Sequence, residues 1–420
     1  MKLCAVIAEF NPLHNGHKYI LQQARSQSGA DAVLVVLGGN FSQRGEPSIV
    51  NKTVRARMAL SCGADIVVEL PTYGAVLSAQ DFAYESVKIA GSFSSVTHLM
   101  FGSESGDIVS ISELAEFLTH EPDYFKAEIS ASLASGNSLP VSKSKALSVI
   151  ISDRYKSFTN PKIASELLNK PNNILGVEYV KALLKLKSKI VPLTSKRMSN
   201  ELKPAGNPLL DYTSGSAIRQ MIYENRSNTK LRNYMPRESF MMLKQEIEKS
   251  CIPDLNIFSN AAMAALRTKS AGELAPVYDM AEGLNNKLVS TALETNSLPA
   301  LINKITSKRY TSARIQRLAL CSLLGIKQES VNALRKQNTP AFVKVLAVKD
   351  NPKLLASLNC SCPLLLRQND YTGLTNPLSR ELIRAETAAT GIYGLLYNFN
   401  DEQLEKYLQA NGFRAKTIFV

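Results

Sequence analysis

The chain has 420 residues, more than one typical hydrophobic core accommodates, so two or three domains are expected. Hydrophobic residues make up 45% and charged residues 20%, which excludes a largely disordered, collagen-like or coiled-coil chain. The formal net charge of +13 favours a polyanionic partner, either nucleic acid or an anionic membrane surface.

Six cysteines are too few for a disulfide scaffold, and they fit a protein of the reducing cytoplasm. Cys360 and Cys362 stand close in sequence, but the chain has only four histidines, so small buried side chains are expected rather than a metal site. The apolar part of the N-terminus is too short for a signal peptide. No apolar run approaches the roughly 20 residues of a membrane span, so no membrane partner is expected.

Apolar runs and helical patterns alternate along the first hundred residues. Because the apolar runs are continuous, they predict strands buried on both faces of a parallel sheet, with helices on both sides. In such sheets ligands bind beyond the carboxyl ends of the strands. Three unusual loops follow those ends, FNPLHNGH, GGNFSQRGEP and FGSESGD. The expected strands are 3–9, 32–37, 65–69 and 98–101, and the expected helices are 17–28, 52–62 and 78–93.

Helical spacing dominates the rest of the chain. Residues 112–187 are expected to be mostly helical, and 189–193 is a last strand candidate. A polar loop with Gly206 and Pro208 then leads to a helix start at TSGSAIRQM. Beyond Pro236 strand-like runs disappear, so we predict an α/β domain at 1–240 and an all-helical domain at 241–420.

Residues 301–350 hold ten Lys and Arg residues against two acidic ones, a net charge of +8. A basic stripe at near-helical spacing can bind a phosphate backbone. A solvated helix face is the alternative. The candidates for contact with RNA are Lys308, Arg309, Arg314 and Arg317.

The first motif that indicates chemistry is His14-Asn15-Gly16-His17, between the first strand and the first helix. At such a junction the helix offers free N–H groups and a positive dipole end to an anion, and glycine lets a phosphate approach closely. Two imidazoles three residues apart can donate hydrogen bonds to one phosphate as charge develops on it. The alternative is a capped turn with two ordinary histidines.

The second motif, Thr213 to Arg219, places small hydroxyl residues at another helix start. Ser214 and Ser216 form a second anion nest, and Arg219 stands one turn in, within reach of β- and γ-phosphates. A plain helix cap is the alternative for SGSAIR alone. The chain lacks the sequence GxxxxGK[ST], so a P-loop enzyme is not expected.

Together the two motifs resemble the HIGH-type nucleotidyltransferase superfamily. Further stretches narrow the resemblance to the bacterial tRNA(Met) cytidine acetate ligase family over most of residues 1–225, and more loosely through KRYTSARIQRLAL and RAETAATGIYGLL. The stretches are AEFNPLHNGHKY, GGNFSQRGEPSIVNKTVRARMAL, GADIVVELP, FGSE, KPNNILGVEYVKAL and SGSAIR. The resemblance implies a Rossmann-like nucleotidyltransferase domain that uses ATP with Mg²⁺.

The resemblance also implies a reaction. Acetate attacks the α-phosphate of ATP to give acetyl-adenylate and pyrophosphate, and the amine of the wobble cytidine in elongator tRNA(Met) then takes the acetyl group and leaves AMP. Two other interpretations stay open. One is a small-molecule adenylyltransferase of coenzyme biosynthesis, and the other is an RNA-binding protein with a relic nucleotide pocket.

The resemblance assigns phosphate contacts to His14 and His17, and the β- and γ-phosphates to Ser214, Ser216 and Arg219. It implies further ATP contacts by Arg197, by Gly102 and by either Asn172 or Asn173, for which a helix cap is the alternative. The segment expected to wrap ATP comprises Ile7, Ala8, Glu9, Phe10, Asn11, Pro12, Leu13, His14, Asn15, Gly16, His17, Lys18, Tyr19 and Ile20.

Three residues of the second strand-end loop, Asn40, Gln43 and Arg44, are candidates for positioning acetate, with a loop salt bridge as the alternative for Arg44. Two features depart from the family pattern. Gly215 stands where alanine or serine is expected, and the loop after Arg197 is polar rather than aromatic.

Overall fold

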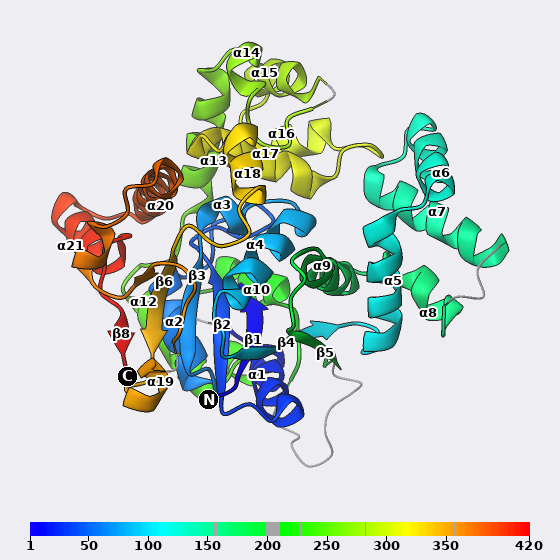
Figure 1. The fold of residues 1–420 in the computed structure, drawn as a ribbon. Coiled ribbons are helices and arrows are strands. Elements are labelled where there is room, and N and C mark those ends of the chain that lie inside the picture. The colour runs from blue at the N-terminus through cyan, green and yellow to red at the C-terminus, as the bar shows by residue number, and fades with distance from the viewer. Residues whose placement is uncertain (154–157, 199–210, 227, 282, 357) are drawn as a thin grey trace.

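The computed structural model describes residues 1–153, 158–198, 211–226, 228–281, 283–356 and 358–420 (Figure 1). The polar loop with Gly206 and Pro208 lies outside the described residues. One sheet runs through the molecule in the order β5-β4-β1-β2-β3-β6-β7, and β8 pairs with β6. The strands are β1 (Leu3–Ala8), β2 (Ala32–Gly38), β3 (Ile66–Leu70), β4 (Val96–Ser103), β5 (Val191–Lys196), β6 (Val343–Val348), β7 (Leu364–Leu365) and β8 (Ile418–Phe419).

The first five strands are parallel and confirm the predicted Rossmann-like sheet, with boundaries shifted by up to three residues. β1 pairs with β2 on one side and with β4 on the other, so the strand order reverses at β1. A ligand is expected beyond the carboxyl end of the strands at such a reversal. The loop that carries His14 and His17 leaves β1 at this point.

Alternate residues of the strands pack into two cores, as the period of a strand requires. Cys4, Val6 and Val35 face a core that includes α1, α2, α10 and α12. Ile7 and Val36 face the other core, which includes α3, α4 and α9. These helices are α1 (Asn15–Ser28), α2 (Lys52–Ser61), α3 (Thr72–Ala75), α4 (Ala79–Gly91), α9 (Pro171–Lys185), α10 (Gly215–Glu224) and α12 (Arg237–Glu248).

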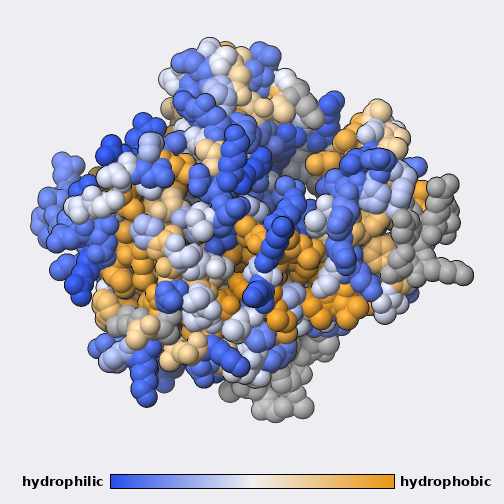
Figure 2. Space-filling model, in the orientation of Figure 1, coloured by the Kyte–Doolittle hydropathy of each residue, from blue (hydrophilic) through white to orange (hydrophobic). Residues whose placement is uncertain are grey.

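A helical arm extends from the sheet after β4, on the right of Figure 1. It confirms the helical prediction for this part of the chain. Its helices are α5 (Ile108–His120), α6 (Asp123–Ala134), α7 (Leu139–Asp153) and α8 (Pro161–Leu167). Figure 2 shows apolar residues gathered between the arm and the middle of this face, and hydrophilic residues over α21 at the opposite side.

The chain after residue 240 is largely helical, but the prediction that it is all-helical is wrong. The six residues of β6 are buried and pair antiparallel with β3, and β8 pairs in turn with β6. An apolar run such as VKVLAV covers the open edge of β3, which would otherwise expose unpaired backbone groups. The helices of this region are α13 (Leu255–Arg267), α14 (Ala271–Leu274), α15 (Leu284–Glu294), α16 (Leu298–Ile305), α17 (Ser312–Leu324), α18 (Gln328–Arg335), α19 (Pro352–Ala356), α20 (Pro377–Leu395) and α21 (Asp401–Asn411).

The division of the chain near residue 240 stays a prediction. Wherever the boundary lies, β6, β7 and β8 of the C-terminal part belong to the same sheet as β1 to β5. Among the described residues, no helix is long and apolar enough to cross a membrane.

Candidate active site

The two histidines of the first motif form one unit at the start of α1, in which His14 is buried and His17 is partly buried. His14 is the N-cap residue, and its backbone N–H donates to His17 Nδ1 at 3.3 Å. The two imidazole rings stack, with centroids 3.7 Å apart and planes 20° from parallel. The His14 ring lies over Gly16, where a Cβ would stand 3.1 Å from His14 Cε1. A larger residue at this position would crowd the His14 ring, so the glycine also serves the packing of the turn itself.

Both imidazoles are neutral near pH 7. Burial, with a smaller contribution from the charge of Arg197, lowers the pKa of His14 to about 3. Burial, His14 and Arg197 lower the pKa of His17 well below its usual value. Because His17 Nδ1 accepts a hydrogen bond, the proton of the neutral ring is on Nε2. His14 Nδ1 is buried and has no partner among the described residues, so it is available to a ligand.

The second motif lies directly against the first. Ser214 is the N-cap of α10, where its Oγ accepts from Ala217 N–H at 3.2 Å and lies 2.9 Å from Ser216 Oγ. Arg219 Nη1 donates to the carbonyl oxygen of Asn11 at 3.0 Å. A Cβ on Gly215 would stand 3.0 Å from that same oxygen, which gives a physical reason for glycine where alanine or serine is expected. Two loops that are about 200 residues apart in sequence thus lie in contact.

Arg219 is also held by an acidic partner that the sequence analysis missed. Its Nη2 lies 3.0 Å from Glu46 Oε2, and the Glu46 side chain is one-third exposed. Because the pair is partly exposed, solvent weakens it, and a phosphate can compete for the guanidinium.

A third group comes from the ends of β4 and β5. Glu104 accepts from the backbone N–H groups of Asn172 and Asn173 and so caps α9. Asn173 is buried, and its Oδ1 accepts from the backbone of Glu104 and Ser105. Asn172 instead accepts from Arg197 Nη1 at 3.0 Å, and the stem of Arg197 lies over Gly102 together with Ile20. Of the two asparagines, Asn172 is the one whose side chain contacts Arg197.

The loop after β2 contains the three acetate candidates, which have different surroundings. Asn40 is buried, and its Nδ2 has no partner among the described residues. The Gln43 side chain donates to Leu77 O at 3.0 Å, and its backbone N–H donates to Glu9 Oε1 at 2.6 Å. Arg44 is exposed. Of the three, only Asn40 offers a buried polar group that is free for a small ligand.

Buried cations from α2 hold this loop in place, and the sequence analysis missed them. Arg55 is fully buried and donates to the carbonyl oxygens of Glu9 at 2.7 Å and of Gly38 at 3.0 Å. Lys52 is buried between Glu69 and Glu386, the latter from α20. Burial and the charge of Glu69 raise the pKa of Glu386 to about 7. The C-terminal region therefore contributes directly to the packing of the strand-end loops.

Comparison with known proteins identifies the family. The profile of the HIGH Nucleotidyl Transferase family matches residues 1–407. The chain is 34% identical to the tRNA(Met) cytidine acetate ligase of Acetivibrio thermocellus, over 94% of this chain and 95% of that protein. It is 36% identical to the protein of the same name from Caldicellulosiruptor saccharolyticus, over 100% of this chain and 99% of that protein.

The chain belongs to the tRNA(Met) cytidine acetate ligase family. The fold agrees with solved structures of that family. The crystal structure of Thermotoga maritima TmcAL bound with alpha-thio ATP is 30% identical, has a TM-score of 0.89 and is covered over its full length. The apo form of the same protein has a TM-score of 0.90.

Within this family member, the segment from Ile7 to Ile20 divides between core and site. Ile7, Phe10 and Leu13 are buried in the two cores, so any contact they make with ATP uses the backbone. Ala8, Glu9, Asn11 and Pro12 lead from β1 into the turn, and Asn11 Oδ1 accepts from Ile49 N–H. Asn15, Lys18 and Tyr19 line a separate cavity. Their ATP contacts stay predictions.

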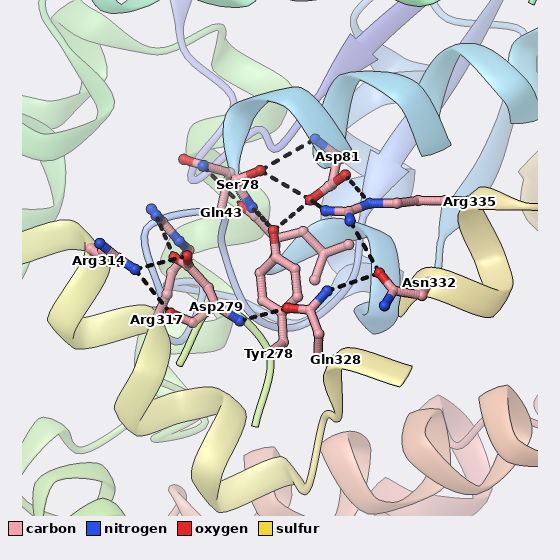
Figure 3. A network of polar contacts seen from close by, with 11 residues as sticks. Gln43, Ser78, Asp81, Tyr278, Asp279, Arg314, Arg317, Gln328, Asn332 and Arg335 are labelled. Atoms are coloured by element: carbon pink, nitrogen blue, oxygen red, sulfur yellow. Dashed lines mark hydrogen bonds and ion pairs between the residues drawn. The ribbon is translucent and has the colours of Figure 1, made fainter. Parts of the chain in front are cut away.

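The four candidates for tRNA contact do not form one open stripe. Lys308 and Arg309 are exposed. Arg314 lies 3.2 Å and Arg317 4.0 Å from the carboxylate of Asp279, and their side chains are only 21% and 13% exposed (Figure 3). Both therefore help to hold α17 against the turn at Asp279, and neither lies on a fully solvated helix face. Contact with tRNA by these four residues stays a prediction.

The described residues contain no group of three His, Cys, Asp or Glu side chains that could hold a metal ion. Cys360 and Cys362 have their Sγ atoms 3.5 Å apart and are partly buried.

Proposed function

We propose that this chain is an ATP-dependent ligase that acetylates the wobble cytidine of elongator tRNA(Met) through an acetyl-adenylate. The observation that supports this most is the contact between the histidine turn and the serine turn, through Arg219 and Asn11. The relatives named above are tRNA(Met) cytidine acetate ligases, and one solved relative binds an ATP analogue. An enzyme of tRNA would act in the cytoplasm.

In the first step an acetate oxygen attacks the α-phosphorus of ATP. A new bond forms between that oxygen and phosphorus, and the bond to the bridging oxygen breaks, so that pyrophosphate leaves. His17 Nε2–H would donate to the phosphate oxygens on which charge develops. Ser214, Ser216 and Arg219 would hold the leaving β- and γ-phosphates at the N-terminus of α10, with Arg219 released by Glu46.

In the second step the exocyclic amine of cytidine attacks the acetyl carbonyl carbon. The carbon–oxygen bond to AMP breaks, and the amine loses one proton to water. The acyl phosphate is a far better acyl donor than free acetate, which is why ATP is consumed.

Acetate is small enough to be held by few groups. The free Nδ2 of Asn40 is a buried donor in the loop after β2, and Arg44 would supply the charge. Mg²⁺ prefers oxygen ligands, which ATP phosphates supply. Since the described residues offer no carboxylate cluster, the phosphates would hold the ion, whose role is to neutralise their charge.

The direct test is mass spectrometry of nucleosides from tRNA incubated with the protein, ATP and isotopically labelled acetate. We expect labelled acetylcytidine in tRNA(Met), and none without ATP or with His17→Ala. Turnover of ATP with acetate but no label in tRNA would contradict the proposal and favour a small-molecule adenylyltransferase. Binding of tRNA without any ATP consumption would favour an RNA-binding protein.

A further inference from the structure

A cavity of about 830 Å³ lies beside α1, between this helix and the segment from Arg232 to Met241. At 100° per residue, the lining residues Asn15, Lys18, Tyr19 and Gln22 share one face of α1. His17 and Ile20 lie on the opposite face, where Ile20 packs against Gly102. The cavity is therefore separate from the predicted adenosine contacts at Gly102 and Arg197.

The wall of this cavity is fixed to the histidine turn. Asn15 Nδ2 donates to the carbonyl oxygens of Asp211 and Asn233, at 3.0 and 2.9 Å. Ser239 Oγ, in the first turn of α12, donates to Leu13 O at 2.8 Å. The cavity wall is thus fastened directly to the loop and turn that carry His14 and His17.

The chemistry of the lining is that of a site for single-stranded nucleic acid. Three cationic side chains, Lys18, Arg232 and Arg237, face one acid, Glu238. Arg232 and Arg237 are exposed, and within the described part of the chain neither guanidinium forms an ion pair. Aromatic rings stand among these charges, from Tyr19, Tyr212 and Phe240. Cations for phosphates and rings for bases are the combination that binds unpaired RNA.

We propose that this cavity binds anticodon-loop nucleotides adjacent to the reacting cytidine, with Arg232 and Arg237 on phosphates and Phe240 against a base. The inference rests on the proposed function, because it takes tRNA as the substrate. It differs from the predicted role of the helical region, since these residues belong to α11 (Leu231–Tyr234) and α12, which pack beside the sheet.

The test uses the full chain and a synthetic anticodon stem–loop of tRNA(Met) as the probe. We expect the double variant Arg232→Glu/Arg237→Glu to bind the stem–loop at least about tenfold more weakly. The matched control Arg232→Lys/Arg237→Lys keeps the charge and should stay within about threefold. In the variant Arg232→Ala/Arg237→Ala the slope of log affinity against log salt concentration should become shallower by about 1.4. This is the value expected when two phosphate contacts on single-stranded RNA are lost.

The aromatic contact has its own variant. Phe240 packs partly against the core, so Phe240→Leu keeps an apolar side chain while it removes the ring. We expect about tenfold weaker binding of the stem–loop, with rescue by Phe240→Tyr.

Acetate-dependent exchange of pyrophosphate into ATP, measured without RNA, shows whether a variant has lost RNA binding alone or also the reaction with ATP. We expect the arginine variants to keep the exchange rate within about twofold. Equal loss of ATP and stem–loop binding would mean that the cavity holds ATP, and unchanged stem–loop binding would mean that it does not hold the RNA. Either result overturns the inference while wild-type acetylation of tRNA stands. A wild-type protein that makes no acetylcytidine would instead refute the proposed function.

Discussion

The two turns that face the predicted phosphates differ in how the protein holds them. The histidine turn is largely buried, its rings stack on each other, and Asn15 fastens it to the backbone of Asp211 and Asn233. The serine turn has both hydroxyls exposed, and Arg219 is shared between a carbonyl oxygen and a carboxylate that is one-third exposed. One turn is fixed before ATP arrives, and the other has partners that ATP can replace.

This difference suggests a division of labour between the turns. A rigid donor is most effective where charge develops during the reaction, because it needs no reorganisation at that moment. An adjustable cation is better suited to the part of the substrate that must leave, since pyrophosphate has to dissociate. The variants below test that division, from the largest expected effect to the smallest.

The largest effect is expected from His17→Ala. Loss of the Nε2 donor should lower the rate of acetate-dependent pyrophosphate exchange by about 10²–10³-fold. His17→Asn is the matched control for stability, because its side-chain oxygen can still accept from His14 N–H. Equal loss of rate with unchanged thermal stability in His17→Asn supports the assignment, whereas full activity in either variant contradicts it.

Variants of Arg219 and Glu46 test whether ATP can replace the partners of the serine turn. Arg219→Ala should lower the exchange rate by roughly 10²-fold and raise the KM for ATP, because a charge-assisted contact to phosphate is lost. Glu46→Gln should change the rate by less than about threefold, since Arg219 keeps its bond to Asn11. If Glu46→Gln is as damaging as Arg219→Ala, the ion pair itself is needed and the exchange of partners is wrong.

The buried histidine turn should make stability depend on pH. The folded pKa of His14 is about 3 against a usual value of 6.5, so the unfolded chain binds more protons between these values. The contribution of His14 to the free energy of unfolding is therefore complete above pH 6.5 and decreases as the pH drops toward 3. Urea unfolding should show a loss of about 2 kcal/mol between pH 7 and pH 5 from this group, at about 1.4 kcal/mol per pH unit below 6.5.

In His14→Asn this loss should shrink, whereas the exposed His120→Asn should leave it unchanged. An identical pH profile for His14→Asn and the wild type would mean that the turn binds a proton as readily as the unfolded chain.

The smallest effect concerns the cap of α10. Ser214→Ala removes the hydrogen bond to Ala217 N–H and should cost about 1 kcal/mol of folding free energy. Ser216→Ala removes a hydroxyl without removing a cap, so its unfolding midpoint should stay close to that of the wild type. Should both variants unfold at the wild-type urea concentration, Ser214 has no capping role.

The sequence predicted what local chemistry determines. Short sequence patterns were enough to predict three features, which the structure places together. They are the strands that precede the loops, the histidine turn and the helix cap at Ser214. What it missed depends on partners far along the chain. Lys52 forms an ion pair with Glu386 from α20, and Arg314 is partly covered because it pairs with Asp279. Helical spacing indicates neither of these partners.

The position of β6 has a consequence for how the protein is made. During synthesis the edge of β3 stays unpaired until residues 343–348 leave the ribosome, which at about 5–20 residues per second takes tens of seconds. A nascent chain in that interval carries an open apolar edge that other chains can join. Fragments cut near residue 240 keep this edge permanently, so insolubility of such a fragment would report a missing strand rather than a missing domain.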